Sequence, residues 1–163
     1  MPITPCSMKE DDVGESRFKD FVQLAIEKET EAAALYDKYA SLVESGTAKQ
    51  LLADMAVMER GHEAKLREFL QTGSAYFSKI GVIEDMHVSD FMTQPELTDT
   101  SSIEDAFVFA MKEEQKAHDL YVKLGALETD AQVTALFKAL ADEESRHKHD
   151  LEAEYEKEFM REG

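Results

Sequence analysis

The sequence predicts an all-α protein, an antiparallel four-helix bundle of two helical hairpins joined by a long crossover. Four segments repeat apolar residues at spacings of three and four, which is the period of an amphipathic helix. Proline and glycine are scarce, with 3 and 7 among 163 residues, as long uninterrupted helices require. The predicted connections are short, long and short in turn, which is typical of a bundle with one crossover.

The first hairpin is expected over residues 16–71. Its first helix should begin at Ser16, because residues 1–15 are polar and aperiodic and are interpreted as a flexible N-terminal tail. Gly46 is expected near the C-terminus of that helix, and the capping-box pattern over residues 47–50 predicts the start of the next. The apolar stripes of these two helices comprise Phe18, Val22, Ala25, Ala32, Tyr36 and Tyr39, then Leu52, Met55, Leu66 and Phe69.

The second hairpin is expected over residues 101–160, within a single domain that covers residues 16–163. Capping-box patterns that begin at Ser101 and Thr129 predict the starts of its helices. Residues 72–100 break the apolar period and are too many for a tight turn, so they should form the crossover. The apolar stripes comprise Ile103, Phe107, Ala110, Ala117, Tyr121 and Leu124, then Phe137, Leu140 and Leu151.

Charge and composition exclude several classes of partner and site. The net charge of −17 repels phosphate backbones and anionic lipid, so neither nucleic acid nor a membrane surface is an expected partner. That charge either aids solubility or attracts cations. The single cysteine excludes an intrachain disulfide and a Cys-based metal site, and it fits a cytoplasmic location. Neither a signal peptide nor a membrane span is visible.

The two predicted hairpins are copies of each other at an offset of 85 residues. No gap is needed across two helices and their loop, so the hairpins should face each other about an approximate two-fold axis. The matched pairs include Ala25 and Ala110, Glu29 and Glu114, Ala32 and Ala117, Tyr36 and Tyr121, Glu59 and Glu144, His62 and His147, and Leu66 and Leu151.

Six polar side chains fall on these apolar stripes and should point into the core. Each hairpin has one Glu on its first helix and a Glu-x-x-His pair on its second, and a three-residue step places that pair on one helix face. The six residues are Glu29, Glu59, His62, Glu114, Glu144 and His147.

Two divalent cations would explain why these side chains are in the core. An unpaired buried carboxylate costs several kcal/mol, and four together repel one another. No Lys or Arg shares the stripes, whereas two divalent ions balance four carboxylates. Carboxylate and imidazole ligands suit iron first, with manganese or zinc as alternatives. Tyr36 and Tyr121 should each donate a hydrogen bond to a carboxylate of the opposite hairpin, the alternative being a core aromatic with no such role.

Three further histidines are not expected to bind this metal pair. Glu84 and His87 also match Glu-x-x-His, but they lie in the predicted crossover, outside any apolar stripe and without a copy in the repeat. His118 and His149 lie off the stripes of their helices and are expected to be exposed.

The motifs resemble the rubrerythrin branch of the ferritin-like superfamily over about residues 16–157. That resemblance implies terminal carboxylates at Glu29 and Glu114, bridging carboxylates at Glu59 and Glu144, and nitrogen ligands from the two motif histidines. It also implies a non-haem di-iron oxidoreductase, of peroxidase or ferroxidase type, that reacts with hydrogen peroxide or oxygen in oxidative-stress defence.

Two departures from the family pattern bear on function. Full-length rubrerythrins carry a rubredoxin domain with four Cys, so the expected electron donor here is a separate protein such as a rubredoxin. Many peroxidase-type members carry an extra Glu at the place of Ala117, which leaves peroxidase activity in question. The alternatives are a ferroxidase or iron-buffering protein, and a bundle in which the metals are only structural. A homodimer also remains open, although no stripe requires one.

Overall fold

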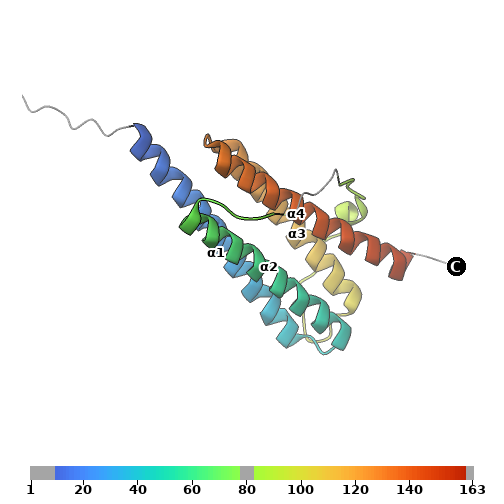
Figure 1. Cartoon of the computed structure of the whole chain (residues 1–163). Coiled ribbons are helices and arrows are strands. Elements are labelled where there is room, and N and C mark those ends of the chain that lie inside the picture. The colour runs from blue at the N-terminus through green and yellow to red at the C-terminus, as the bar shows by residue number, and fades with distance from the viewer. Residues whose placement is uncertain (1–9, 78–82, 161–163) are drawn as a thin grey trace, which may run out of the picture.

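The computed structural model describes residues 10–77 and 83–160, with the side chains from residue 18 onward. Within these ranges the chain forms four long helices and no strand, which confirms the all-α four-helix bundle (Figure 1). The elements are α1 (Glu10–Leu42), α2 (Gly46–Thr72), the 3₁₀ helix η1 (Val88–Phe91), α3 (Ile103–Leu127), α4 (Ala131–Tyr155) and the π-helix η2 (Glu156–Met160). None of the described helices is long and apolar enough to span a membrane.

Helix α1 starts earlier than the sequence predicted. It begins at Glu10 rather than Ser16, so the prediction of a tail is wrong for residues 10–15, and the rest of that tail lies outside the described residues. The apolar period detects only the part of a helix that packs against a partner. The first turns of α1, blue in Figure 1, extend past the end of α2.

The three predicted capping boxes are shifted by one or two residues. Helix α2 is capped by Ser45, whose hydroxyl accepts from the Ala48 N–H at 3.3 Å, so Gly46 is its first residue instead of the end of α1. Ser102 forms the capping box of α3, and Asp130 caps α4. In each case another Ser or Asp near the predicted cap satisfies the free N–H groups of the first turn, a choice that the apolar period cannot resolve.

Two hydrophobic clusters fill the bundle, one toward each end, and all four helices contribute to both. One contains Tyr36, Leu52, Met55, Phe109, Met111 and Leu151, and the other contains Ile26, Leu66, Tyr121, Phe137 and Leu140. The six predicted ligands fall between these clusters on every helix. The apolar ends therefore enclose a polar layer at the middle of the bundle and separate it from solvent along the bundle axis.

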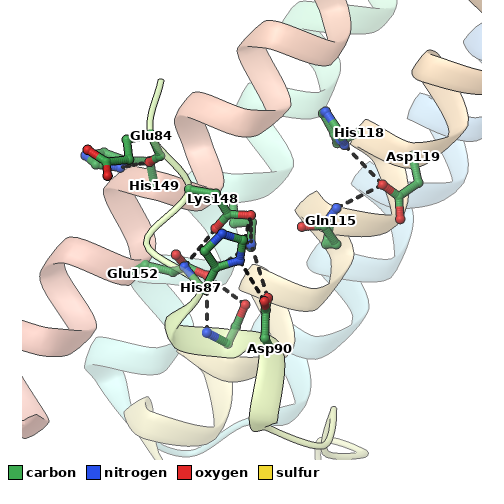
Figure 2. A network of polar contacts seen from close by, with 11 residues as sticks. Glu84, His87, Asp90, Gln115, His118, Asp119, Lys148, His149 and Glu152 are labelled. Atoms are coloured by element: carbon green, nitrogen blue, oxygen red, sulfur yellow. Dashed lines mark hydrogen bonds and ion pairs between the residues drawn. The ribbon is translucent and has the colours of Figure 1, made fainter. Parts of the chain in front are cut away.

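The crossover is held against α4 by a buried ion-pair network. The Lys148 ammonium, only 5% exposed, lies 2.9 Å from Asp85 Oδ1 and 3.3 Å from Glu152 Oε1. Glu152 also accepts from the backbone N–H and the hydroxyl of Ser89 in η1, at 3.2 and 2.7 Å. Figure 2 shows how Lys148 and Glu152 meet the crossover near His87. Because Lys148 already supplies a cation, we interpret these acidic groups as part of the fold.

Replacing Lys148 by Met should destabilise the protein strongly. The variant leaves Glu152, which is fully buried, without its cation, and breaking one partner of a buried pair costs about 3 kcal/mol. The melting temperature should fall by about 10 °C in a domain of this size. Lys138→Met is the control, because Lys138 is 74% exposed on the same helix and pairs with Asp142 in solvent. Equal melting temperatures for the two variants would contradict this role for Lys148.

Candidate metal centre

The structure brings the six predicted side chains together at the centre of the bundle. Helix α1 supplies Glu29 and α3 supplies Glu114, while the other four come from the Glu-x-x-His pairs of α2 and α4. They form two overlapping groups whose ligand atoms lie within 4.8 Å of one another. The first is Glu29, Glu59, His62 and Glu144, and the second is Glu114, Glu144 and His147. Glu144 belongs to both groups and has no exposed surface.

The Nδ1 atoms of both imidazoles face the carboxylates. His62 Nδ1 lies 2.8 Å from Glu144 Oε1, 3.4 Å from Glu59 Oε2 and 3.6 Å from Glu29 Oε1. His147 Nδ1 lies 3.5 Å from Glu114 Oε2 and 3.7 Å from Glu144 Oε2. The two rings are stacked, with centroids 5.3 Å apart and planes 11° from parallel. Both hairpins thus present the same nitrogen atom to one cluster of oxygens.

Two buried phenols hold carboxylates of the opposite hairpin. Tyr36 of α1 donates to Glu114 Oε1 at 3.3 Å, and Tyr121 of α3 donates to Glu29 Oε1. Burial raises the pKa of both phenols well above the usual value, and the carboxylate each one contacts raises it further. Each hydroxyl therefore keeps its proton and remains a hydrogen-bond donor, which orients the carboxylate beside it.

Glu143 is a site residue that the sequence did not predict. Its Oε2 accepts from His62 Nε2 at 2.8 Å, and its Oε1 accepts from Lys65 Nζ at 2.9 Å. Burial opposes its ionisation, but its bonds to these two groups lower the pKa of Glu143 to about 2. The residue at the matching place in the first hairpin is Met58, so a search guided by the repeat passes over Glu143. Its only signal in the sequence is that it stands directly before Glu144.

The chemistry of the centre fits cations. Six of its buried atoms have no hydrogen-bond partner among the described residues, and they are Glu59 Oε2, His62 Nδ1, Glu114 Oε2, both Glu144 oxygens and His147 Nδ1. Buried polar atoms without partners are rare, because each one costs free energy. All six are lone-pair donors of the kind that iron, manganese and zinc accept. A pair of cations between them would satisfy every one.

Without metal, the centre keeps protons that ordinary carboxylates would lose. Burial raises the pKa of Glu29 and of Glu114 well above the usual value, and neighbouring carboxylates raise both further. Burial lowers the pKa of His62, but Glu144, Glu143 and Glu29 raise it more, so the net shift is well upward. For Glu144 burial is outweighed by Glu114 and the imidazoles, which lower its pKa. A metal must displace the retained protons in order to bind.

A pocket of about 270 Å³ connects the centre with the surface between α1 and α3. It reaches Glu29 and Glu59, and Ala32 and Ala117 leave space along its walls. The ion pairs Lys28–Glu31 and Lys116–Glu113 also line it, at 3.0 and 2.9 Å. They stand at matching places in the repeat with their charges exchanged. The opposite face, between α2 and α4, carries the two imidazoles, with exposures of 4% for His62 and 18% for His147.

The histidines excluded from the site lie outside it. His87 is 64% exposed in the crossover, where its Nδ1 lies 2.7 Å from Asp90 Oδ2. His118 is 31% exposed beside Asp119, and His149 donates to the backbone carbonyl of Glu84. The side chains of His118 and His149 are partly buried, and so less exposed than their places off the stripes predicted.

Comparisons with known proteins agree with this geometry. The family model described as Rubrerythrin matches residues 20–155, which include all six predicted ligands. A solved structure titled as a hypothetical protein from Pyrococcus furiosus is 27% identical, with a TM-score of 0.53. The match covers 85% of this chain and 88% of that one, so the two share their fold over nearly their whole length. No curated protein matches the sequence.

Proposed function

Because the chain belongs to the rubrerythrin family, we propose that its central cluster binds two iron ions and reduces hydrogen peroxide. Glu29 and Glu114 would each bind one ion, and Glu59 and Glu144 would bridge the two. The histidines of the Glu-x-x-His pairs would complete the ligand sets through Nδ1, the atoms that lack hydrogen-bond partners among the described residues. Four carboxylates and two divalent ions leave the buried centre neutral, which removes the cost of the buried charges.

When bound, two ferrous ions supply the two electrons that, with two protons, convert one hydrogen peroxide molecule into two waters. The chain itself holds and shields the reacting centre. Tyr36 and Tyr121 donate hydrogen bonds to Glu114 and Glu29, which would orient these two carboxylates toward the ions. The hydrophobic clusters exclude water from both ends of the bundle.

The pocket between α1 and α3 is the single observation that favours a reactive metal pair over one that only stabilises the bundle. A metal that only stabilises a bundle needs no route to solvent, whereas about 270 Å³ of space leads here to Glu29 and Glu59. A water molecule takes about 30 Å³, so the pocket admits peroxide or oxygen together with water. Its volume lies below the range of about 300 to 1,000 Å³ that is usual for larger organic ligands, so it suits a small oxidant better.

Electrons must return to the centre after each turnover, and we expect a separate electron-transfer protein, such as a rubredoxin, to deliver them. His147 is the most exposed of the proposed ligands, at 18%, and it lies on the face away from the pocket. Electrons and peroxide can therefore reach the iron pair from different sides.

Ala117 supports a second candidate function, a ferroxidase or iron-handling protein. Many peroxidase-type relatives have a carboxylate at this place, whereas here the methyl side chains of Ala117 and Ala32 line the pocket in matching positions. Oxygen would then oxidise ferrous iron at the centre, and the strongly acidic surface, with a net charge of −17, would attract that iron.

Stopped-flow spectroscopy of the anaerobically loaded di-ferrous protein distinguishes the two functions. The peroxidase proposal expects oxidation by stoichiometric peroxide at least about tenfold faster than by equimolar oxygen, followed by multiple turnovers when a rubredoxin and reductant are added. Faster oxidation by oxygen, with many irons oxidised per chain, would favour the ferroxidase. A protein whose iron reacts with neither oxidant would leave only a structural role for the metal.

Ala117→Leu should slow the oxidation of the metal centre by peroxide without removing the metal. The added side chain fills part of the pocket that leads to Glu29, so the rate of oxidation by peroxide should fall about tenfold. The metal content should stay at the level of the unmodified protein, as measured by elemental analysis. Val122→Leu, at a half-exposed position of the same helix, controls for the larger side chain. An unchanged rate in Ala117→Leu would show that the oxidant uses another route.

A further inference from the structure

The two halves of the centre differ in what holds their imidazoles. The 85-residue offset maps each predicted ligand onto another ligand, but it maps Glu143 onto Met58 and Lys65 onto Asp150. His62 Nε2 is bonded to Glu143 at 2.8 Å, whereas His147 Nε2 has no hydrogen-bond partner within the described part of the chain. The approximate symmetry of the ligands is therefore broken just outside them.

We propose that Glu143 is a positioning residue that makes the two metal positions unequal, so that the position containing His62 binds the first and tighter ion. This inference rests on the proposed function, namely that the cluster binds two metal ions. The tighter position consists of Glu29, Glu59, His62 and Glu144. The weaker one is built around His147, and the residue that matches Glu143 in the other hairpin is Met58.

Two contacts support the assignment. The hydrogen bond to Glu143 places the ring proton of His62 on Nε2, which leaves the Nδ1 lone pair directed at the carboxylates. A carboxylate at the far side of an imidazole also makes the ring a stronger metal ligand. Lys65 of α2 donates a hydrogen bond to Glu143 of α4 at 2.9 Å. This second bond fixes the Glu143 carboxylate and, through it, the orientation of the His62 ring.

The His147 ring lacks this support. A methionine sulfur at the place of Glu143 is only a weak acceptor and carries no charge. The His147 side chain is also more exposed, 18% against 4% for His62, so less of it is held by packing. Its ring keeps its place through the stack with His62 and not through a hydrogen bond. An ion at this position is bound by a ligand whose orientation and tautomer are less restricted.

Calorimetric titration with Mn²⁺ under anaerobic conditions tests the inference in two single-position backgrounds. His147→Ala leaves the position of His62, and His62→Ala leaves the position of His147. Adding Glu143→Ala should lower the Mn²⁺ affinity about tenfold in the first background and less than about twofold in the second. Glu143→Gln, which keeps an acceptor without the charge, should recover part of the loss. Glu63→Ala, which removes a carboxylate that pairs with Arg67 on α2, should change neither affinity.

The outcomes separate this inference from the proposed function. If the unmodified protein binds no Mn²⁺ and no Fe²⁺, the proposed di-metal function fails. If it binds two ions but Glu143→Ala weakens both backgrounds equally, Glu143 acts on the fold as a whole and the inference is overturned. Should either single-position variant fail to fold, as judged by circular dichroism, Glu143→Ala is titrated alone. It must then weaken only the tighter of the two binding steps, and an equal effect on both steps overturns the inference.

Discussion

Glu144→Gln is expected to abolish the loading of the centre with two metal ions. Glu144 is the one carboxylate that belongs to both ligand groups, and it is fully buried with both oxygens free of hydrogen bonds to the described residues. Replacing it removes the one negative charge that the two metal positions share and introduces an amide nitrogen where a ligand oxygen is needed. The affinity for ferrous iron should fall by at least about 100-fold, and the rate of reaction with peroxide should fall with it.

Elemental analysis of protein purified without oxygen measures this effect, and Glu152→Gln is its matched control. Glu152 is an equally buried carboxyl group on the same helix, but it is bonded to Ser89 and Lys148 away from the centre. The control should keep its metal content even if its melting temperature falls. Two irons per chain in Glu144→Gln would contradict the assignment of Glu144 as a bridging ligand.

Removing the metal is expected to lower the melting temperature by about 10 °C at pH 7.5. One ion at a free concentration of about 1,000 times its Kd stabilises the folded state by about 4 kcal/mol. In a domain of this size about 1 kcal/mol corresponds to roughly 2–4 °C. Calorimetry with Mn²⁺ and after treatment with a chelator gives the difference. The Glu144→Gln variant is the control, because a chelator should change its melting temperature by much less.

The effect of the metal should grow with pH. In the metal-free protein the pKa values of Glu29 and Glu114 are raised above 4.5 and that of His62 above 6.5, so the folded state binds more protons than the unfolded one. The stability of the metal-free protein therefore falls as pH rises from about 5 to 8. Glu144 and Glu143 have lowered pKa values, and their contribution is lost only as pH falls below about 4.5.

The metal-loaded protein should respond in the opposite direction. Bound cations have already displaced these protons, so higher pH favours metal binding by removing the competition from H⁺. The gap between the melting temperatures of loaded and metal-free protein should thus widen from pH 5.5 to pH 8. A gap that stays constant across this range would show that Glu29, Glu114 and His62 do not hold protons in the metal-free centre.

The apolar period and the repeat predicted the fold and the set of side chains that meet at its centre. Glu29 and Glu114 stood out because each interrupts an apolar stripe at the same place in its copy. In a helix, residues at spacings of three and four point in the same direction, so the residues of one stripe face the same core. The convergence of six distant residues was therefore predictable without knowledge of any loop.

The contacts outside the repeat were not predictable in this way. Glu143 lies beside a stripe and has no acidic copy, so neither signal marks it. Lys148 is buried because the crossover folds over it, and the crossover has no period from which its path could be inferred. The start of α1 and the caps at Ser45, Ser102 and Asp130 depend on local hydrogen bonds, for which several neighbouring residues compete.

The two faces of the centre differ: the pocket lies between α1 and α3, and the imidazoles lie on the side of α2 and α4. The pocket opens toward α1 and α3, and His147 supplies the most exposed edge of the centre on the side of α2 and α4. A redox protein docked over that edge would leave the entrance for small molecules unobstructed. Under the proposed function, the electron donor and the next oxidant molecule would bind on opposite faces, so neither would have to leave before the other binds.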